Sequence, residues 1–307
     1  MKKLNGCYVI GVDHGYGNIK TANFCFPTGL IESDTEPIFS QNVLMWNGRY
    51  YSIGEGHKEF TADKFKDPDF YVLTLAAIAR ELNKAGIYEA SVFIAAGLPL
   101  TWVSQQKEEF KRYLLQNSEL SFKFRGRDFH IKFLGAEIYP QGFAAVAAEL
   151  PNFTGENMLC DIGNGTMNIL HIVNMHPDPL RMYTEKYGTE QCTLAIKESM
   201  MKLHHTNIDE QLITQILKTG KADIDSEYLK TIIHTAKEYT SGIYRRLREH
   251  DYDPRLMMLY VVGGGGCLIK NFSGNKLSRV IINSDICATA KGYELLAERS
   301  IKKGGIK

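Results

Sequence analysis

The chain has 307 residues, of which 44% are hydrophobic, and its formal net charge is +1 at pH 7. This length predicts about two domains with a substantial apolar core. The near-neutral charge gives no electrostatic argument for direct binding to nucleic acid or to a membrane, and no apolar run is long enough to span one. Because Met1–Gly6 has no apolar signal segment, we expect a cytoplasmic protein without membrane association.

The cysteines are scattered, with neither C-x-x-C spacing nor a histidine at metal-ligand distance. We therefore predict buried free thiols in a reducing compartment. They are Cys7, Cys25, Cys160, Cys192, Cys267 and Cys287. The adjacent pair His204 and His205 is predicted to lie at the surface or at a helix end rather than at a metal, because neighbouring residues do not share a helix face.

The first half alternates strands with helices. In chain order, the predicted elements are strands at 7–12 and 19–26, a hairpin of 43–46 and 49–54 around Asn47-Gly48, a helix containing 75–82 and closed by Gly86, a strand at 91–95, a helix capped by Ser104, and a strand at 129–133. Apolar periodicity, Asn-Gly turn chemistry and capping residues support these assignments.

The alanine-rich segment 137–150, entered through Pro140, predicts a helix that links two similar halves. The second half then contains strands at 158–161 and 168–173, a long helix at 228–250, a strand at 259–262 followed by four glycines, and a final helix near 287–297. Alternating strands and helices predict the α/β class.

A glycine-rich turn of the phosphate-binding type occurs twice. The copies read Asp13-His14-Gly15-Tyr16-Gly17-Asn18 and Asp161-Ile162-Gly163-Asn164-Gly165-Thr166. Each follows an apolar strand, so each predicts a hairpin whose tip offers N–H groups to phosphate oxygens, with a carboxylate beside it for Mg²⁺. Either copy alone is more typical of an ordinary glycine turn, but the repetition favours two hairpins that grip a nucleoside triphosphate.

Other residues carry weaker signals. Lys20 follows the first turn and is placed to reach the β- and γ-phosphates, while Gly263–Gly266 either face a base or ribose or form a plain strand-to-helix turn. Gln141 either orients an attacking water or caps a helix. Lys237 and Glu238 either contact the nucleoside or form a solvated helix face. No P-loop or dinucleotide-binding fingerprint is present.

The order of these motifs resembles the actin, sugar kinase and heat-shock ATPase superfamily, and more narrowly the bacterial actin-like ParM (StbA) plasmid-segregation family. The narrower likeness rests on Gly97-Leu98-Pro99-Leu100, Tyr51-Ser52-Ile53-Gly54-Glu55, Tyr139-Pro140-Gln141-Gly142 and Ala288-Thr289-Ala290-Lys291-Gly292-Tyr293. It implies an actin-like fold with two similar lobes, each a mixed β-sheet flanked by helices, and a nucleotide in the interlobe cleft. The implied lobes are 1–148 with 287–307, and 149–286.

The resemblance also implies site roles. Asp13 and Asp161 would bind Mg²⁺ and act in catalysis with Gln141, which stands where ParM has an acidic residue. ATP is the implied nucleotide and GTP the alternative. The implied nucleotide-binding residues are Gly15, Tyr16, Gly17, Asn18, Lys20, Gly163, Asn164, Gly165, Thr166, Lys237, Glu238, Gly263, Gly264 and Gly265.

These observations predict an ATPase that polymerises into filaments on binding Mg-ATP and disassembles after hydrolysis, for plasmid or DNA segregation. Its partners would be further copies of itself and an adaptor protein bound to DNA. The alternative is a small-molecule kinase of the same superfamily, which needs a carboxylate base, and segment 95–99 has none. A chaperone-like module and a membrane-anchored relative are disfavoured, the latter because tail 301–307 is short and broken by glycine.

Overall fold

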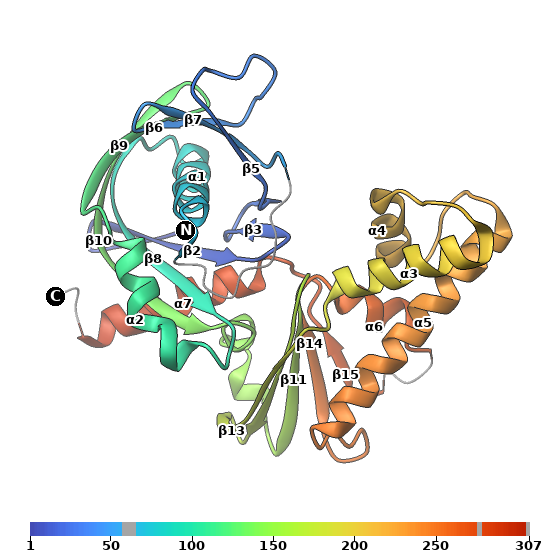
Figure 1. Ribbon diagram of the computed structural model, residues 1–307. Helices are drawn as coiled ribbons and strands as arrows, with labels where there is room; N and C mark the ends of the chain where they lie inside the picture. The colour runs from blue at the N-terminus through green and yellow to red at the C-terminus, as the bar shows by residue number, and fades with distance from the viewer. Residues whose placement is uncertain (57–65, 275–277, 305–307) are drawn as a thin grey trace. The chain divides into compact units, whose positions relative to one another are not determined.

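The structure is a computed structural model that describes residues 1–56, 66–274 and 278–304. Its Cα positions divide the chain into two compact units, which are coloured along the chain in Figure 1. Unit 1 comprises Met1–Ala148 and Cys287–Lys307, and unit 2 comprises Glu149–Ile286. Residues 305–307 of the predicted basic tail lie outside the described residues.

Unit 1 contains a ten-stranded sheet in the order β4-β3-β2-β8-β10-β9-β6-β7-β5, with β1 also paired to β2. The strands are β1 Lys2–Leu4, β2 Cys7–His14, β3 Asn18–Lys20, β4 Cys25–Pro27, β5 Leu30–Ser33, β6 Val43–Trp46, β7 Arg49–Ile53, β8 Glu89–Leu98, β9 Glu119–Phe124 and β10 Arg127–Pro140. Pairing of β8 with β2 and β10 is parallel and the other pairings are antiparallel, so the sheet is mixed.

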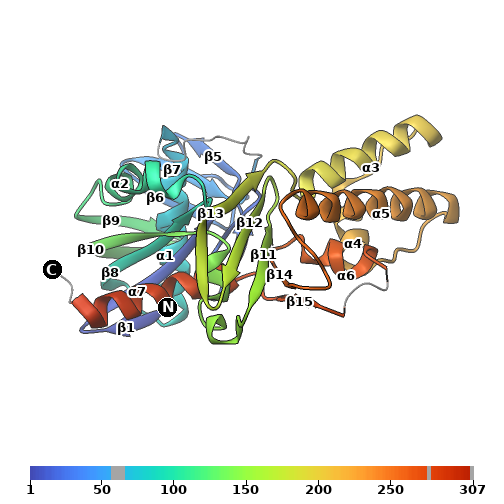
Figure 2. The ribbon, with the colours of Figure 1, turned by 90° about the horizontal axis from the view of Figure 1, so that it is seen from below.

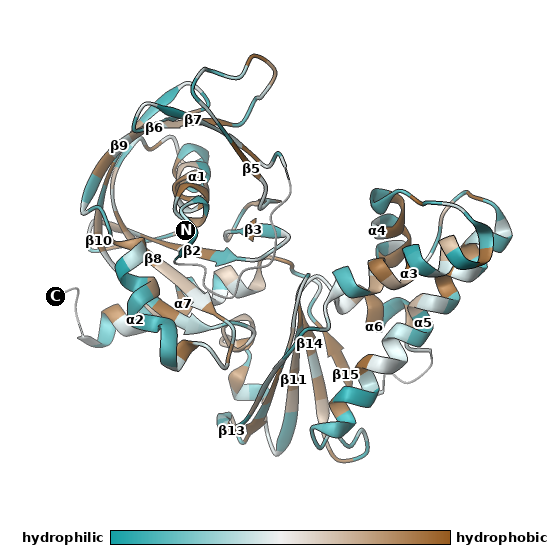
Figure 3. Ribbon diagram, in the orientation of Figure 1, coloured by the Kyte–Doolittle hydropathy of each residue, from teal (hydrophilic) through white to brown (hydrophobic). Residues whose placement is uncertain are grey.

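Helices cover both faces of this sheet. They are α1 Asp69–Lys84, α2 Val103–Leu114 and α7 Ala288–Gly304, and the hydrophobic residues of α1 are brown in Figure 3. Adjacent strand residues point to opposite faces. Ile10 of β2 belongs to the core that includes α1, whereas Val9 packs with α7. A continuous apolar run in β2 is therefore what a strand covered on both sides requires.

The contact between α7 and its neighbours brings backbone against backbone. A Cβ on Gly11 would lie 2.0 Å from the carbonyl oxygen of Ala290, and one on Gly292 would lie 1.8 Å from that of Ala144. Because no side chain fits at such distances, both glycines are needed for α7 to pack where it does.

Unit 2 contains a five-stranded sheet in the order β13-β12-β11-β14-β15. Its strands are β11 Glu156–Ile162, β12 Met167–Val173, β13 His176–Glu185, β14 Met258–Val262 and β15 Val280–Ile282. Helices α3 Thr189–His204, α4 Glu210–Thr219, α5 Ser226–Glu249 and α6 Gly266–Phe272 lie on one face of this sheet, as Figures 1 and 2 show. Their apolar sides form one core with β11, β12 and β14.

Several sequence predictions are corrected. Segment 137–150 is not a helix: β10 continues to Pro140, followed by 3₁₀ turns at Phe143–Val146 and Leu150–Asn152. The strand predicted at 19–26 is interrupted, giving β3 and β4. Ser104 does not cap α2, whose N-cap residue is Trp102. All six cysteines are free, but Cys25 is exposed and Cys267 and Cys287 are only partly buried, so the prediction of buried thiols is wrong for these three. The Asn47-Gly48 hairpin is confirmed, with φ values of 50° and 74°.

Candidate functional site

The first hairpin joins β2 to β3, whose antiparallel register sets Asp13 opposite Lys20. Its turn is held from one side by buried Thr28 on the loop after β4. The Thr28 hydroxyl donates to the Gly15 carbonyl at 2.7 Å, and the Thr28 N–H donates to the Gly17 carbonyl at 3.2 Å. In a trans peptide the N–H points opposite to the C=O. The N–H groups of Tyr16 and Asn18 therefore point away from Thr28.

Asp13 is the centre of a small polar cluster within unit 1. Its side chain is buried, and its Oδ1 accepts a hydrogen bond from Nε2 of Gln141 at 3.0 Å. Its Oδ2 lies 3.5 Å from Nζ of Lys20. Gln141 is itself fixed at the end of β10 by a hydrogen bond from its N–H to the Leu98 carbonyl, at 2.8 Å. Asp13, Lys20 and Gln141, which were all predicted to act in nucleotide binding or hydrolysis, thus lie together.

The second hairpin joins β11 to β12, with Asp161 opposite Asn168. Two carbonyl groups of its turn also accept hydrogen bonds from one side, here from the first residues of α3. The N–H of Thr189 donates to the Gly163 carbonyl at 3.0 Å, and the N–H of Glu190 donates to the Asn164 carbonyl at 2.9 Å. By the same peptide geometry, the N–H groups of Asn164 and Gly165 point away from α3.

The start of α3 is in turn anchored to α5. The Tyr239 hydroxyl donates to the Gly188 carbonyl at 2.7 Å, and the Tyr239 ring stacks on Tyr187 with centroids 4.2 Å apart. Arg246 covers the Tyr187 ring at 3.6 Å and pairs with Glu185 at 2.8 Å. These contacts fix the segment against which the second hairpin rests.

The glycine turn after β14 packs directly against the second hairpin. Gly263 has φ +84°, and a Cβ there would lie 2.5 Å from Oδ1 of Asp161. The N–H of Gly265 donates to the Ile162 carbonyl at 2.9 Å. Gly264 differs, because a Cβ there would meet nothing within 4 Å. The turn therefore shapes the surroundings of Asp161, and Gly264 borders open space.

Lys237 and Glu238 lie on the exposed side of α5, and Glu238 lies 3.5 Å from His234. They stand next to Tyr239, the residue that anchors the start of α3. That these two side chains contact a nucleoside stays a prediction.

Each hairpin carries a carboxylate of the kind that Mg²⁺ binds. No group of three or more histidine, cysteine or acidic side chains that could hold a metal occurs in the described part of the chain. Mg²⁺ does not require one, because it commonly keeps several waters and binds one or two carboxylates plus phosphate oxygens. Asp13 and Asp161, each at the end of a buried strand, offer such carboxylates.

Sequence reasoning missed the residues that support the hairpins. Thr28, Gly188, Thr189 and Tyr239 lie outside both repeated turns, and their hydrogen bonds to the turns or to the start of α3 arise only in the folded chain. The one local signal is Gly188-Thr189 before an amphipathic segment, which is a typical helix start.

Comparison with known proteins gives a consistent fold. Residues 11–143 match the family described as the N-terminal domain of actin-like proteins. No curated protein sequence matches the chain. The apo psk41 ParM protein has a TM-score of 0.75 at 17% identity over 97% of this chain and 99% of its own. An archaeal actin homologue in complex with ADP gives 0.73 at 21% identity, covering 95% of this chain and 99% of that one. A 15-stranded ParM filament from Clostridium botulinum has a TM-score of 0.75 at 18% identity, over 96% of this chain and 99% of its own.

These findings define the chain as a protein with the actin-like fold, built from two units that each contain a mixed β-sheet flanked by helices. The actin-like fold that the resemblance implied is thereby confirmed, and two of the structures that share it are described as ParM proteins. Across the described helices, none combines the length and apolar character of a membrane span.

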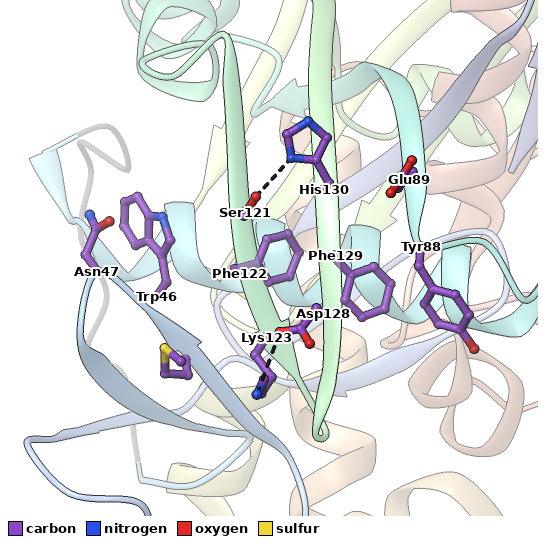
Figure 4. Close-up of a pocket in the computed structure, with 11 residues that line it drawn as sticks. Trp46, Asn47, Tyr88, Glu89, Ser121, Phe122, Lys123, Asp128, Phe129 and His130 are labelled. Carbon is purple, nitrogen blue, oxygen red and sulfur yellow. Dashed lines mark hydrogen bonds and ion pairs between the residues drawn. The ribbon is translucent and has the colours of Figure 1, made fainter.

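A separate hollow of about 310 Å³ lies on unit 1, and none of its lining residues belongs to the first hairpin (Figure 4). It crosses β9 and β10 between Trp46 of β6 and Tyr88 at the start of β8. Several of its polar residues are already paired: the His130 ring hydrogen-bonds Ser121 and the neighbouring Glu119, and Lys123 lies 3.7 Å from Asp128. We assign no function to this hollow.

Proposed function

We propose that this chain is a nucleoside triphosphatase that binds Mg-ATP through its two hairpins and assembles into filaments with further copies of itself. Hydrolysis would weaken the filament, and the cellular role would be segregation of plasmid or other DNA in the cytoplasm through a DNA-bound adaptor. GTP is the alternative nucleotide.

The observation that carries this proposal is the shared construction of the two turns. In each turn two carbonyl groups are held from one side, so the N–H groups of the following residues point to the other. Pairs of oriented N–H groups beside a strand-end carboxylate suit phosphate oxygens and their bound Mg²⁺. Two unrelated supports, Thr28 and the start of α3, produce this same result.

Gln141 is the residue that would orient the water molecule for hydrolysis of the bound nucleotide. Its Nε2 is engaged by Asp13, which leaves its side-chain carbonyl oxygen to accept a hydrogen bond from a water molecule. Such a water would attack the γ-phosphorus as the bond to the β,γ-bridging oxygen breaks, releasing ADP and inorganic phosphate, and the proton that the water loses would end on the released phosphate. A glutamine amide is no base, so its contribution would be to orient the water. Bound Mg²⁺ would neutralise charge on the phosphate oxygens.

Relatives of the same fold support the nucleotide and the filament. One structure is described as a complex with ADP, another as a ParM filament. An assembly of this kind requires a head-to-tail contact that does not close into a ring. The kinase alternative is less well supported, because the buried end of β8 at Ala95–Leu98 offers no carboxylate to accept a hydroxyl proton.

The test is sedimentation and light scattering of the full chain with Mg-ATP, Mg-GTP, Mg-ADP or no nucleotide. We expect a pellet that depends on triphosphate and decays as phosphate is released. Absence of any nucleotide-dependent assembly, together with rapid phosphate transfer to a sugar or small acid, would favour the kinase instead.

A further inference from the structure

Two arginine side chains of unit 1 converge on one neutral acceptor. Oδ1 of Asn42 accepts hydrogen bonds from Arg80 at 3.1 Å and from Nε of Arg125 at 2.9 Å, with a second bond from the Arg125 guanidinium. An amide oxygen has two lone pairs. It therefore cannot fully satisfy this set of donors, and it carries no charge to neutralise either cation.

Three separate parts of the fold position these side chains. Asn42 directly precedes β6, and its carbonyl accepts the Ile53 N–H at 3.0 Å. Arg125 lies in the β9–β10 turn with φ 51°, and its N–H donates to the Val43 carbonyl at 2.9 Å. Arg80 projects from α1. The convergence is thus built into the backbone rather than made by long, freely rotating side chains alone.

Among the residues that the structure describes, the two positive charges have no counter-charge. Over residues 1–56, 66–274 and 278–304, no ion pair joins Arg80 or Arg125 to a carboxylate, and the buried Nε of Arg80 has no hydrogen-bond partner. The rings of Phe26 and Phe124 lie 4.5 Å and 5.4 Å from the Arg80 guanidinium. Aromatic faces attract a cation but do not neutralise it.

The charge of the two arginines also indicates a site that lacks an anion. Burial, and then the positive charge of Arg125, lower the pKa of Arg80 to about 10. At about pH 7 the Arg80 guanidinium therefore remains charged. Two like charges held together, one of them partly buried, are an unfavourable arrangement that a bound anion would relieve.

We propose that Asn42, Arg80 and Arg125 form a binding site for a phosphate-type dianion. The planar guanidinium fork matches phosphate oxygens, and a dianion neutralises both cations where a chloride ion or a single carboxylate would neutralise one. The dianion is either free phosphate or the phosphoryl group of a small phosphomonoester. This site is separate from the hairpins and does not depend on the proposed nucleotide chemistry.

The experiment is isothermal titration calorimetry of the nucleotide-free full chain with sodium phosphate, at constant ionic strength set with sodium chloride. We expect Arg125→Gln to weaken phosphate binding by about tenfold or more, because it removes charged hydrogen bonds. Arg127→Gln is the matched control: this arginine is also exposed and lies in the same hairpin, but its guanidinium bonds to the Tyr88 hydroxyl. It should bind phosphate as the wild type does.

Two further arms make the result decisive. Asp13→Ala, which alters the first hairpin, should leave phosphate binding intact, and Arg80→Lys should weaken it while circular dichroism shows a folded chain. Titration with phosphoserine distinguishes the sources: binding of phosphate alone indicates the free ion, and tighter binding of phosphoserine indicates a monoester. The proposal is overturned if the wild type binds no phosphate, if Arg125→Gln binds equally well, or if Asp13→Ala abolishes binding.

Discussion

Nε2 of Gln141 donates a hydrogen bond to Oδ1 of Asp13 across 3.0 Å, joining the end of β10 to the first hairpin. We expect Gln141→Ala to slow hydrolysis by about 100-fold while nucleotide affinity changes little, because a misplaced water costs rate rather than binding. Single-turnover phosphate release and equilibrium nucleotide binding separate the two effects. The exposed Gln116→Ala is the control. An equal loss of affinity would instead make Gln141 a structural support.

Asp161 lies one residue before the end of the buried strand β11, beside the glycine turn. Asp161→Ala should bind Mg-ATP poorly or hydrolyse it far more slowly, since the carboxylate proposed to bind Mg²⁺ is lost. Titration of Mg²⁺ at fixed ATP is the measurement, and the metal dependence should shift to higher concentration. Asp223→Ala, at an exposed position, should behave as the wild type. Unchanged magnesium dependence in Asp161→Ala would remove this residue from the site.

Thr28 holds the first turn through its hydroxyl. Thr28→Val keeps the shape of the side chain but leaves the buried Gly15 carbonyl without that donor, so the free energy of unfolding should fall by about 1–3 kcal/mol. Nucleotide affinity should fall as well, because the turn loses one of its two supports. Thr28→Ser restores the hydroxyl and should recover affinity. If serine and valine bind nucleotide alike, the hydroxyl does not position the turn.

The glycine turn after β14 offers a matched pair of substitutions. Gly263→Ala places a methyl group 2.5 Å from Oδ1 of Asp161 and at φ +84°, so it should destabilise the chain and disturb Asp161. Gly264→Ala meets nothing within 4 Å and should be nearly neutral for stability. Urea unfolding and nucleotide titration measure both variants. Equal behaviour of the two would contradict this packing.

His171 makes stability depend on pH. Burial lowers the pKa of His171 from its ordinary value of 6.5, and its Nε2 hydrogen-bonds the His250 carbonyl at 2.8 Å. In the unfolded chain the imidazole takes up a proton below about pH 6.5, whereas in the folded chain it resists until lower pH. The free energy of unfolding should therefore fall as pH drops below 6.5 and be insensitive to this group above it.

His171→Gln keeps a donor without an ionisable ring, so its stability should vary less between pH 7 and pH 5.5 than that of the wild type. Chemical denaturation at several pH values measures the slope, and the comparison with the variant isolates His171 from other titrating groups. Identical slopes would show that His171 contributes nothing to the pH dependence.

Local chemistry was enough to predict the two hairpins and most strands and helices. The Asp and Gly residues of each turn act within a few positions of one another, so their pattern is visible in the sequence. The segment 137–150 was predicted wrongly because its alanines favour a helix, whereas pairing of β10 with β8 extends the strand to Pro140. Tertiary pairing overrode propensity there.

The supports of the hairpins were beyond sequence reasoning for a different reason. Thr28 reaches Gly15 across 13 positions and Tyr239 reaches Gly188 across 51, so no local pattern records either contact. The cluster of Asn42, Arg80 and Arg125 likewise joins three distant segments. Residues that act through tertiary contacts become visible only once the fold is known.

The central claim is that both hairpins bind the phosphates of one Mg²⁺-bound nucleotide. A crystal structure of the chain with Mg²⁺ and a non-hydrolysable ATP analogue tests it most directly. We predict phosphate oxygens within hydrogen-bond distance of the N–H groups of Tyr16, Asn18, Asn164 and Gly165. A nucleotide bound elsewhere, or one that contacts neither turn, would contradict the account.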